Sequence, residues 1–111
     1  MHELGLCTSI VDAIEKRAGP RPVARVRVRV GQLHHVHPDA FDQSFAVAAV
    51  GTIAQDARAE LVLLPVVVRC GGCGHSWEGI ELPVVCPACQ SFEIELLGGD
   101  ELVLESIEYR A

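Results

Sequence analysis

Two short motifs decide how this chain folds: Cys70-Gly71-Gly72-Cys73 and, twelve residues later, Cys86-Pro87-Ala88-Cys89. Each C-x-x-C pair is typical of a knuckle, a tight turn that points two sulfur atoms at one centre. Four thiolates in a tetrahedral array suit a zinc ion, with Zn–S distances of about 2.3 Å. The spacing therefore predicts a zinc site on these four cysteines. The alternative is two disulfides in a secreted domain, or free thiols.

A zinc ion held by four cysteines has no open coordination position, so the predicted site is structural and not catalytic. The C-x-x-C-G and C-P-x-C patterns also resemble the iron knuckles of rubredoxin, which leaves an electron carrier as one alternative. A zinc-ribbon interaction module for nucleic acid is another. If the metal is a structural zinc ion, or the zinc ion of an interaction module, the function depends on residues outside the four ligands. If the chain is an electron carrier, the function depends on iron instead of zinc.

The charge balance bears on the class of partner. The chain has 111 residues, of which 50% are hydrophobic, and a formal charge of -6. A hydrophobic core of useful size is therefore possible, and a bound structural metal ion can stabilise a part of the chain that has no such core. Metal-bound thiolates would make the charge more negative still. This excess of carboxylates disfavours nucleic acid as the main partner and favours basic protein surfaces or cations.

No membrane or secretion signal is recognisable in the sequence. Residues 1–7 lack the basic and long apolar regions of a signal peptide, and the longest apolar run, residues 61–68, is interrupted by Pro65. We therefore expect a cytoplasmic protein without membrane contact, in a compartment where cysteines stay reduced.

The first 31 residues predict one helix followed by one strand. Apolar residues at helical spacing, with Cys7 among them, indicate a helix from about Leu4 to Ala18. We expect Cys7 to be a small buried hydrophobe, and the alternative is a reactive thiol or a fifth metal ligand. In residues 25–30 arginine alternates with valine, which indicates a half-buried strand. The arginine row is either an anion-binding stripe or a solvated face paired with glutamates on a neighbouring strand.

The rest of the chain, from residue 32 onward, predicts a loop, a helix and three strands. Residues 32–37 form a loop with three histidines, and Pro38 suits the first turn of the second helix. Strands are expected over residues 60–69, with an edge or bulge at Pro65, over 92–97 and over 102–109. The last strand follows the knuckles, which suggests that the chain returns to the first sheet. The predicted class is α+β, with residues 1–68 plus 100–111 as one subdomain and residues 69–99 as an inserted zinc-binding subdomain.

The N-terminus offers a second metal site in the triplet Met1-His2-Glu3. A free α-amine, the His2 amide nitrogen and the His2 Nδ1 atom can close fused five- and six-membered rings on one metal ion. A deprotonated amide in such a set favours planar coordination, and hence Ni(II) or Cu(II). The alternative is a frayed terminus with a solvated His2 and with Glu3 favouring the start of the helix.

Taken together, these features resemble the HypA family, the nickel metallochaperones of nickel–iron hydrogenase maturation. The matching residues span almost the whole chain. They are Met1-His2-Glu3-Leu4 with Leu6-Cys7, Val30-Gly31-Gln32-Leu33, Pro38-Asp39-Ala40-Phe41, Gly51-Thr52, Ala57, the two knuckles, and Gly99-Asp100-Glu101-Leu102 before Ile107-Glu108. The knuckles alone are generic, whereas an N-terminal Met-His-Glu joined to them at this spacing is specific.

The resemblance implies two helices on a small mixed three-stranded sheet, with a zinc-ribbon-like module on the four cysteines. It implies a nickel site on His2, with Glu3 nearby, and transient binding of Ni(II) by a protein that is not an enzyme. The implied partners are a HypB-type GTPase and the hydrogenase large-subunit precursor, and some members also serve urease. We expect a monomer or a weak homodimer.

One departure from this family pattern is the group of three histidines within residues 32–37, and His75 also needs an interpretation. His34, His35 and His37 form either a polar loop and helix cap or an accessory nickel relay. His75, two residues after Cys73, either forms a hydrogen bond to a thiolate, replaces a thiolate when that thiolate is protonated, or is solvated; we expect the hydrogen bond or the solvated position.

Overall fold

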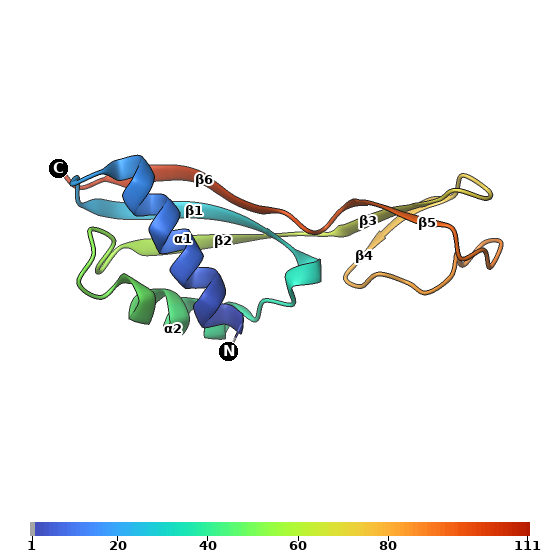
Figure 1. The fold of residues 1–111 in the computed structure, drawn as a ribbon, viewed down its shortest axis with the longest axis horizontal. Helices are drawn as coiled ribbons and strands as arrows, with labels where there is room; N and C mark the ends of the chain where they lie inside the picture. Colours follow the sequence, from blue (N-terminus) through green and yellow to red (C-terminus); the bar gives the residue numbers. More distant parts are fainter. Residues whose placement is uncertain (1) are drawn as a thin grey trace. The chain divides into compact units, whose positions relative to one another are not determined.

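Two helices and six strands follow one another along residues 2–111, the part of the chain that the computed structural model describes (Figure 1). They are α1 (His2–Ala18), β1 (Val23–Gly31), the 3₁₀ turn η1 (Gln32–His34), α2 (Pro38–Ala49), β2 (Arg58–Leu64), β3 (Val66–Cys70), β4 (Ser76–Gly79), β5 (Ile94–Gly98) and β6 (Leu102–Tyr109). The strands form two three-stranded sheets, ordered β2-β1-β6 and β4-β3-β5. The predicted α+β class is confirmed. None of the described helices combines the length and hydrophobicity that crossing a bilayer requires.

The chain forms two compact units. The first unit contains Met1–Arg29, Val36–Val62 and Val103–Ala111, and the second contains Val30–His35 and Leu63–Leu102. The chain therefore passes between the units at several points. The subdomains expected from the sequence, residues 1–68 plus 100–111 and residues 69–99, are segments that fold together, and these bounds remain a prediction.

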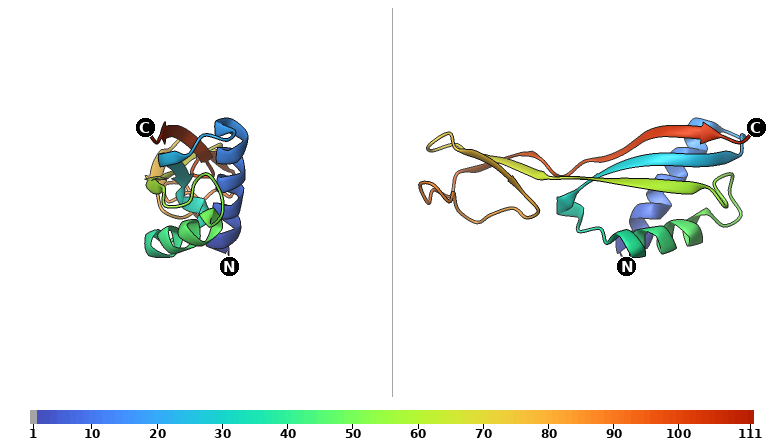
Figure 2. Two further views of the ribbon diagram at one scale, coloured as in Figure 1. Left: turned by 90° about the vertical axis from the view of Figure 1, so that its left-hand side faces the viewer. Right: turned by 180° about the vertical axis from the view of Figure 1, so that it is seen from behind.

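In the first unit both helices cover one face of the sheet β2-β1-β6 (Figure 2). The apolar stripe of α1 is buried as predicted, and α2 contributes two stacked phenylalanine rings. The core residues are Cys7, Ile10, Val11, Ile14, Phe41, Phe45, Val23, Val26 and Val28. Helix α1 begins at His2, two residues earlier than the predicted Leu4, and the negative Glu3 is favourable in its first turn.

The arginine row of β1 is paired with glutamates on both neighbouring strands, as one of the two interpretations predicts. The ion pairs are Arg25–Glu108, Arg27–Glu105, Arg27–Glu60 and Arg29–Glu105. Their side chains are roughly half exposed, so each pair contributes about 0–1 kcal/mol to stability. The row is a charge-matched outer face of the sheet, because its cations already have carboxylate partners.

Cys7 is a buried core residue, as predicted. Its side chain has no exposed surface, and its thiol donates to the Phe41 carbonyl oxygen with an Sγ–O distance of 3.6 Å. Burial, together with the carboxylates of Glu3 and Asp42, raises the pKa of the Cys7 thiol to about 11. Cys7 therefore contributes to packing and is a poor metal ligand or nucleophile in the folded protein.

This burial predicts how Cys7 reacts. At pH 8 iodoacetamide should modify Cys7 only after unfolding, whereas the exposed Cys73 and Cys89 react once a chelator is present. Because the folded-state pKa is raised, the stability contribution of the neutral thiol is complete below about pH 9 and is lost as the pH rises through about 11. Mass spectrometry of peptides after timed labelling measures how fast Cys7 and Cys73 react. Labelling of Cys7 as fast as Cys73 in native buffer would contradict the buried position.

In the second unit β3 is the central strand of the sheet and pairs antiparallel with β4 and β5. Val66, Val68 and Cys70 alternate as its buried residues. The single strand predicted over residues 60–69 is wrong: Pro65, which lacks a backbone N–H, separates β2 from β3. Strand β4 was not predicted, because its four residues are too few to show a periodic pattern and depend on β3 for pairing.

Candidate metal sites

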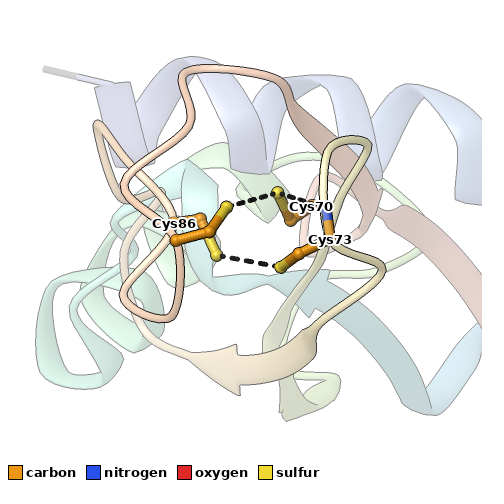
Figure 3. A group of neighbouring side chains, drawn as sticks. Cys70, Cys73 and Cys86 are labelled. Atoms are coloured by element: carbon orange, nitrogen blue, oxygen red, sulfur yellow. Dashed lines mark hydrogen bonds between the residues drawn. The ribbon is translucent and has the colours of Figure 1, made fainter.

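The four cysteines of the two knuckles form one cluster of sulfur atoms, and Figure 3 shows three of them, Cys70, Cys73 and Cys86, with their side chains pointing toward one another. Cys70 ends β3, Cys73 follows in the turn, and Cys86 and Cys89 come from the segment between β4 and β5. All four sulfur atoms lie within 4.8 Å of one another. Among residues 2–111 they are the only cluster of three or more side chains that could share a metal ion.

Both knuckles are built by the same backbone hydrogen bonds. In the first, the N–H groups of Gly72 and Cys73 donate to Cys70 Sγ at 3.3 and 3.4 Å, and Gly74 N–H donates to the Cys70 carbonyl at 2.9 Å. In the second, Ala88 N–H donates to Cys86 Sγ at 3.4 Å, and Gln90 N–H donates to the Cys86 carbonyl at 2.8 Å. Gly74 and Gln90 close the two turns with positive φ angles of 79° and 64°.

The separations between sulfur atoms fit tetrahedral coordination. Cys70 Sγ lies 3.6 Å from Cys89 Sγ, and Cys73 Sγ lies 3.7 Å from Cys86 Sγ. A tetrahedron with Zn–S bonds of about 2.3 Å has S–S edges of about 3.8 Å. These cysteines are free and not disulfide-bonded. The donor set therefore suits one tetrahedral thiolate-binding metal ion.

The thiol pKa values show why this cluster favours a cation. The N–H groups of Cys73 and Gly72 stabilise the thiolate of Cys70 and, although burial opposes them, lower the pKa of Cys70 to about 6. The N–H of Ser91 acts in the same direction on Cys89, but the neighbouring sulfur atoms of Cys70, Cys73 and Cys86 outweigh it and raise the pKa of Cys89 to about 12. One thiolate therefore suppresses ionisation of its neighbours. Only a positive ion lets all four bind as thiolates.

His75 is not one of the ligands in this cluster. Its imidazole ring stacks on Trp77 with a centroid distance of 5.2 Å, and its carbonyl accepts the N–H of Cys70 at 2.8 Å. The backbone of His75 thus supports the first knuckle while its ring packs against β4.

At the N-terminus, the structure places His2 and Glu3 in the first turn of α1. His2 is half exposed, and its Nδ1 atom lies 3.3 Å from Glu3 Oε1. The other carboxylate oxygen, Glu3 Oε2, accepts the backbone N–H of His37, the residue before α2, at 3.3 Å. Glu3 therefore links the starts of both helices and keeps a negative charge beside the His2 imidazole. Met1, whose α-amine belongs to the predicted nickel site, lies outside the described residues.

The surroundings of Glu3 favour its ionised form. Partial burial raises the pKa of this carboxyl group. Four neighbouring groups lower it: its own backbone N–H, the N–H of His37, and the imidazoles of His2 and His37. Their sum lowers the pKa of Glu3 below its ordinary value. The contact with His37 spans 34 residues of sequence, and no local pattern could have revealed it.

The three loop histidines differ in their surroundings. His34 Nε2–H donates to the Asp100 carbonyl oxygen at 3.0 Å, so only its Nδ1 atom is left for a metal. His35 is exposed and has a left-handed backbone conformation, and His37 is exposed before α2. No shared metal-binding group forms from these three imidazoles within the part of the chain that the structure describes.

Comparison with known proteins gives a consistent result over almost the full length. A family model described as "Hydrogenase/urease nickel incorporation, metallochaperone, hypA" matches residues 1–109. The chain is 36% identical to the hydrogenase maturation factor HypA of Desulfitobacterium hafniense, with 97% of each chain covered. It is also 36% identical to the HypA of Rhodopseudomonas palustris (strain BisB5), with 97% of this chain and 98% of the other covered.

The fold is similar to a solved structure as well. The solution structure of the Ni metallochaperone HypA from Helicobacter pylori superposes with a TM-score of 0.67 at 25% identity, covering 100% of this chain and 99% of the other. The similarity therefore extends over both units and includes the segments that carry both candidate metal sites.

Proposed function

Since this chain belongs to the HypA family of hydrogenase/urease nickel-incorporation metallochaperones, we propose that it binds Ni(II) through His2 and delivers it during maturation of a nickel–iron hydrogenase or of urease. The observation that carries the proposal is the position of His2, which is half exposed in the first turn of α1 with its Nδ1 atom beside Glu3. Nickel is the cargo in this proposal and not a resident cofactor.

The chemistry of the N-terminus supports this role. The His2 N–H belongs to the first turn of α1, where backbone N–H groups have no acceptor within the helix. Deprotonation of this amide for a metal therefore breaks no helical hydrogen bond. The imidazole is accessible, and its Nδ1 atom can exchange the carboxylate of Glu3 for the metal ion. Glu3 remains nearby as a negative charge that favours a cation.

We assign the four-cysteine cluster to a structural Zn(II) ion and expect no enzymatic activity from the chain. The cysteines fit the tetrahedral geometry of zinc and leave no open position for a substrate. The free thiols require a reducing compartment, and we place the protein in the cytoplasm for that reason.

A nickel titration tests the proposed site. The zinc-loaded chain with a free N-terminus should bind one Ni(II) ion in calorimetry. One residue added before Met1 should remove this binding, because the amine becomes an amide and the chelating arm becomes longer. The matched control is one residue added after Ala111, which leaves the donor atoms untouched. Equal nickel binding by both extended chains would contradict an N-terminal site.

The partners that we propose are a HypB-type GTPase and the hydrogenase large-subunit precursor. Because the chain is acidic, its association with them should weaken as salt rises. Pull-down from cells that express a nickel–iron hydrogenase, at low and high salt, measures this. Salt-sensitive retention of DNA or RNA without a maturation partner would instead support a zinc-ribbon module.

A further inference from the structure

The second unit carries nearly all of the excess negative charge. Its formal charge is -5, because it contains one arginine against six carboxylates, whereas the first unit is close to neutral. The charged residues of the second unit are Arg69, Glu78, Glu81, Glu93, Glu95, Asp100 and Glu101. A protein surface that binds this unit should therefore be basic.

The same unit exposes large apolar side chains on one short segment. Residues 80–85, which we call the strap, connect β4 to the second knuckle. The exposed fractions of Ile80, Leu82 and Val84 are 67%, 49% and 79%. Three such side chains within five residues are uncommon on a surface that faces only water, and such surfaces often mark interaction sites.

Among residues 2–111, the backbone of the strap has no hydrogen-bonding partner. Its C=O groups, and the N–H groups of its residues other than Pro83, which has none, form no hydrogen bond there. The preceding strand β4 is an edge strand, because it pairs only with β3 in its sheet. Free backbone groups on and after an edge strand are a template for an added strand.

The charged side chains of this segment are also available. Glu95 is paired with Arg69 at 2.7 Å, but no ion pair involving Glu78 or Glu81 occurs in residues 2–111. These two exposed glutamates lie on β4 and on the strap, among the exposed apolar residues. The surface thus combines apolar side chains, free backbone groups and unneutralised carboxylates.

We propose that β4 and the strap bind an extended segment of a partner protein in which apolar residues alternate with lysine or arginine. Backbone hydrogen bonds to the free groups of β4 and the strap hold the segment, and its apolar side chains contact Ile80, Leu82 and Val84. Its cations lie on the opposite face, beside Glu81, within the negative field to which Glu78 also contributes. This docking surface goes beyond the nickel function and does not depend on His2.

A peptide of this chemistry tests the proposal on the metal-loaded full chain. The probe is the blocked octapeptide Lys-Val-Lys-Val-Lys-Val-Lys-Val, and its binding is followed by the emission of Trp77, the single tryptophan, which lies on β4. We expect saturable binding, slower amide hydrogen exchange in the strap, and at least tenfold weaker binding by the double variant Ile80→Ser/Val84→Ser. The variant Glu78→Gln/Glu81→Gln should lose most of the salt dependence.

Two controls separate this surface from non-specific attraction. The double variant Val47→Ser/Val50→Ser changes side chains that are 63% and 67% exposed in the first unit, and it should bind the peptide with unchanged affinity. The same peptide methylated at every backbone nitrogen keeps its charges but has no backbone donors, and it should not bind. The proposal is overturned if the parent peptide fails to bind, if the methylated peptide binds equally well, or if the strap variant retains full affinity with its metal content intact.

Discussion

Replacement of His2 by Ala is expected to abolish specific Ni(II) binding and to leave the fold and the zinc content unchanged. The substitution removes the imidazole, the only side-chain donor of the proposed chelate, so the affinity should fall by on the order of 100-fold or more, beyond the range that loss of a supporting residue causes. His2 is half exposed and contributes nothing to the core, so circular dichroism and thermal unfolding should not change. Calorimetric titration with Ni(II) measures the loss.

Three comparison variants make this experiment specific. His2→Gln should behave like His2→Ala. Glu3→Gln keeps the imidazole but removes a charge and weakens the contact with His37, and should lower the affinity by about tenfold. The triple replacement of His34, His35 and His37 by Ala should have little effect, because these imidazoles form no shared site within residues 2–111. Unchanged nickel affinity and stoichiometry in His2→Ala would show that the N-terminal site, and the delivery role built on it, are wrong.

Replacement of Cys73 by Ala is expected to release the metal of the knuckles and to unfold the segment from Arg69 to Phe92. Structural zinc contributes about 10–16 kcal/mol of apparent binding free energy in small zinc-dependent peptides, and this binding is coupled to folding. The buried hydrophobic residues of the second unit are Val30, Val66, Val68, Cys70 and Cys86, so it has little else to hold these loops. The first unit, with its own helix-covered core, should stay folded and keep part of its nickel binding.

Metal analysis and amide NMR spectra of the purified protein distinguish the outcomes. The parent chain should hold one zinc ion per molecule and be colourless, and Cys73→Ala should lose the dispersed signals of residues 69–92 alone. Cys7→Ala is the matched control: it removes a thiol in the first unit, outside the metal cluster, and should keep the zinc. Stoichiometric iron with a visible thiolate absorption band would instead identify an electron carrier. No metal at all would overturn the structural role.

Local patterns in the sequence determined much of this protein. The two knuckles, the buried face of α1, the bounds of β6 at Leu102–Tyr109 and the half-buried β1 all follow from spacing or periodicity within one segment. Such patterns can be read from the sequence because the preference of each residue there depends on its near neighbours. The nickel chelate that we propose for Met1 and His2 is likewise suggested by local sequence, since its donor atoms belong to consecutive residues.

The tertiary structure decided the features that depend on distant partners. Strand β4 exists because β3 pairs with it, and residues 30–35 belong to the second unit through hydrogen bonds such as Leu33 N–H to the Gly99 carbonyl at 2.9 Å. The contact of Glu3 with the His37 N–H, and the free backbone of the strap, likewise result from how separate segments meet or fail to meet. A contact between two segments that are distant in the sequence leaves no periodic pattern in either of the two segments. For that reason only the folded chain reveals such contacts.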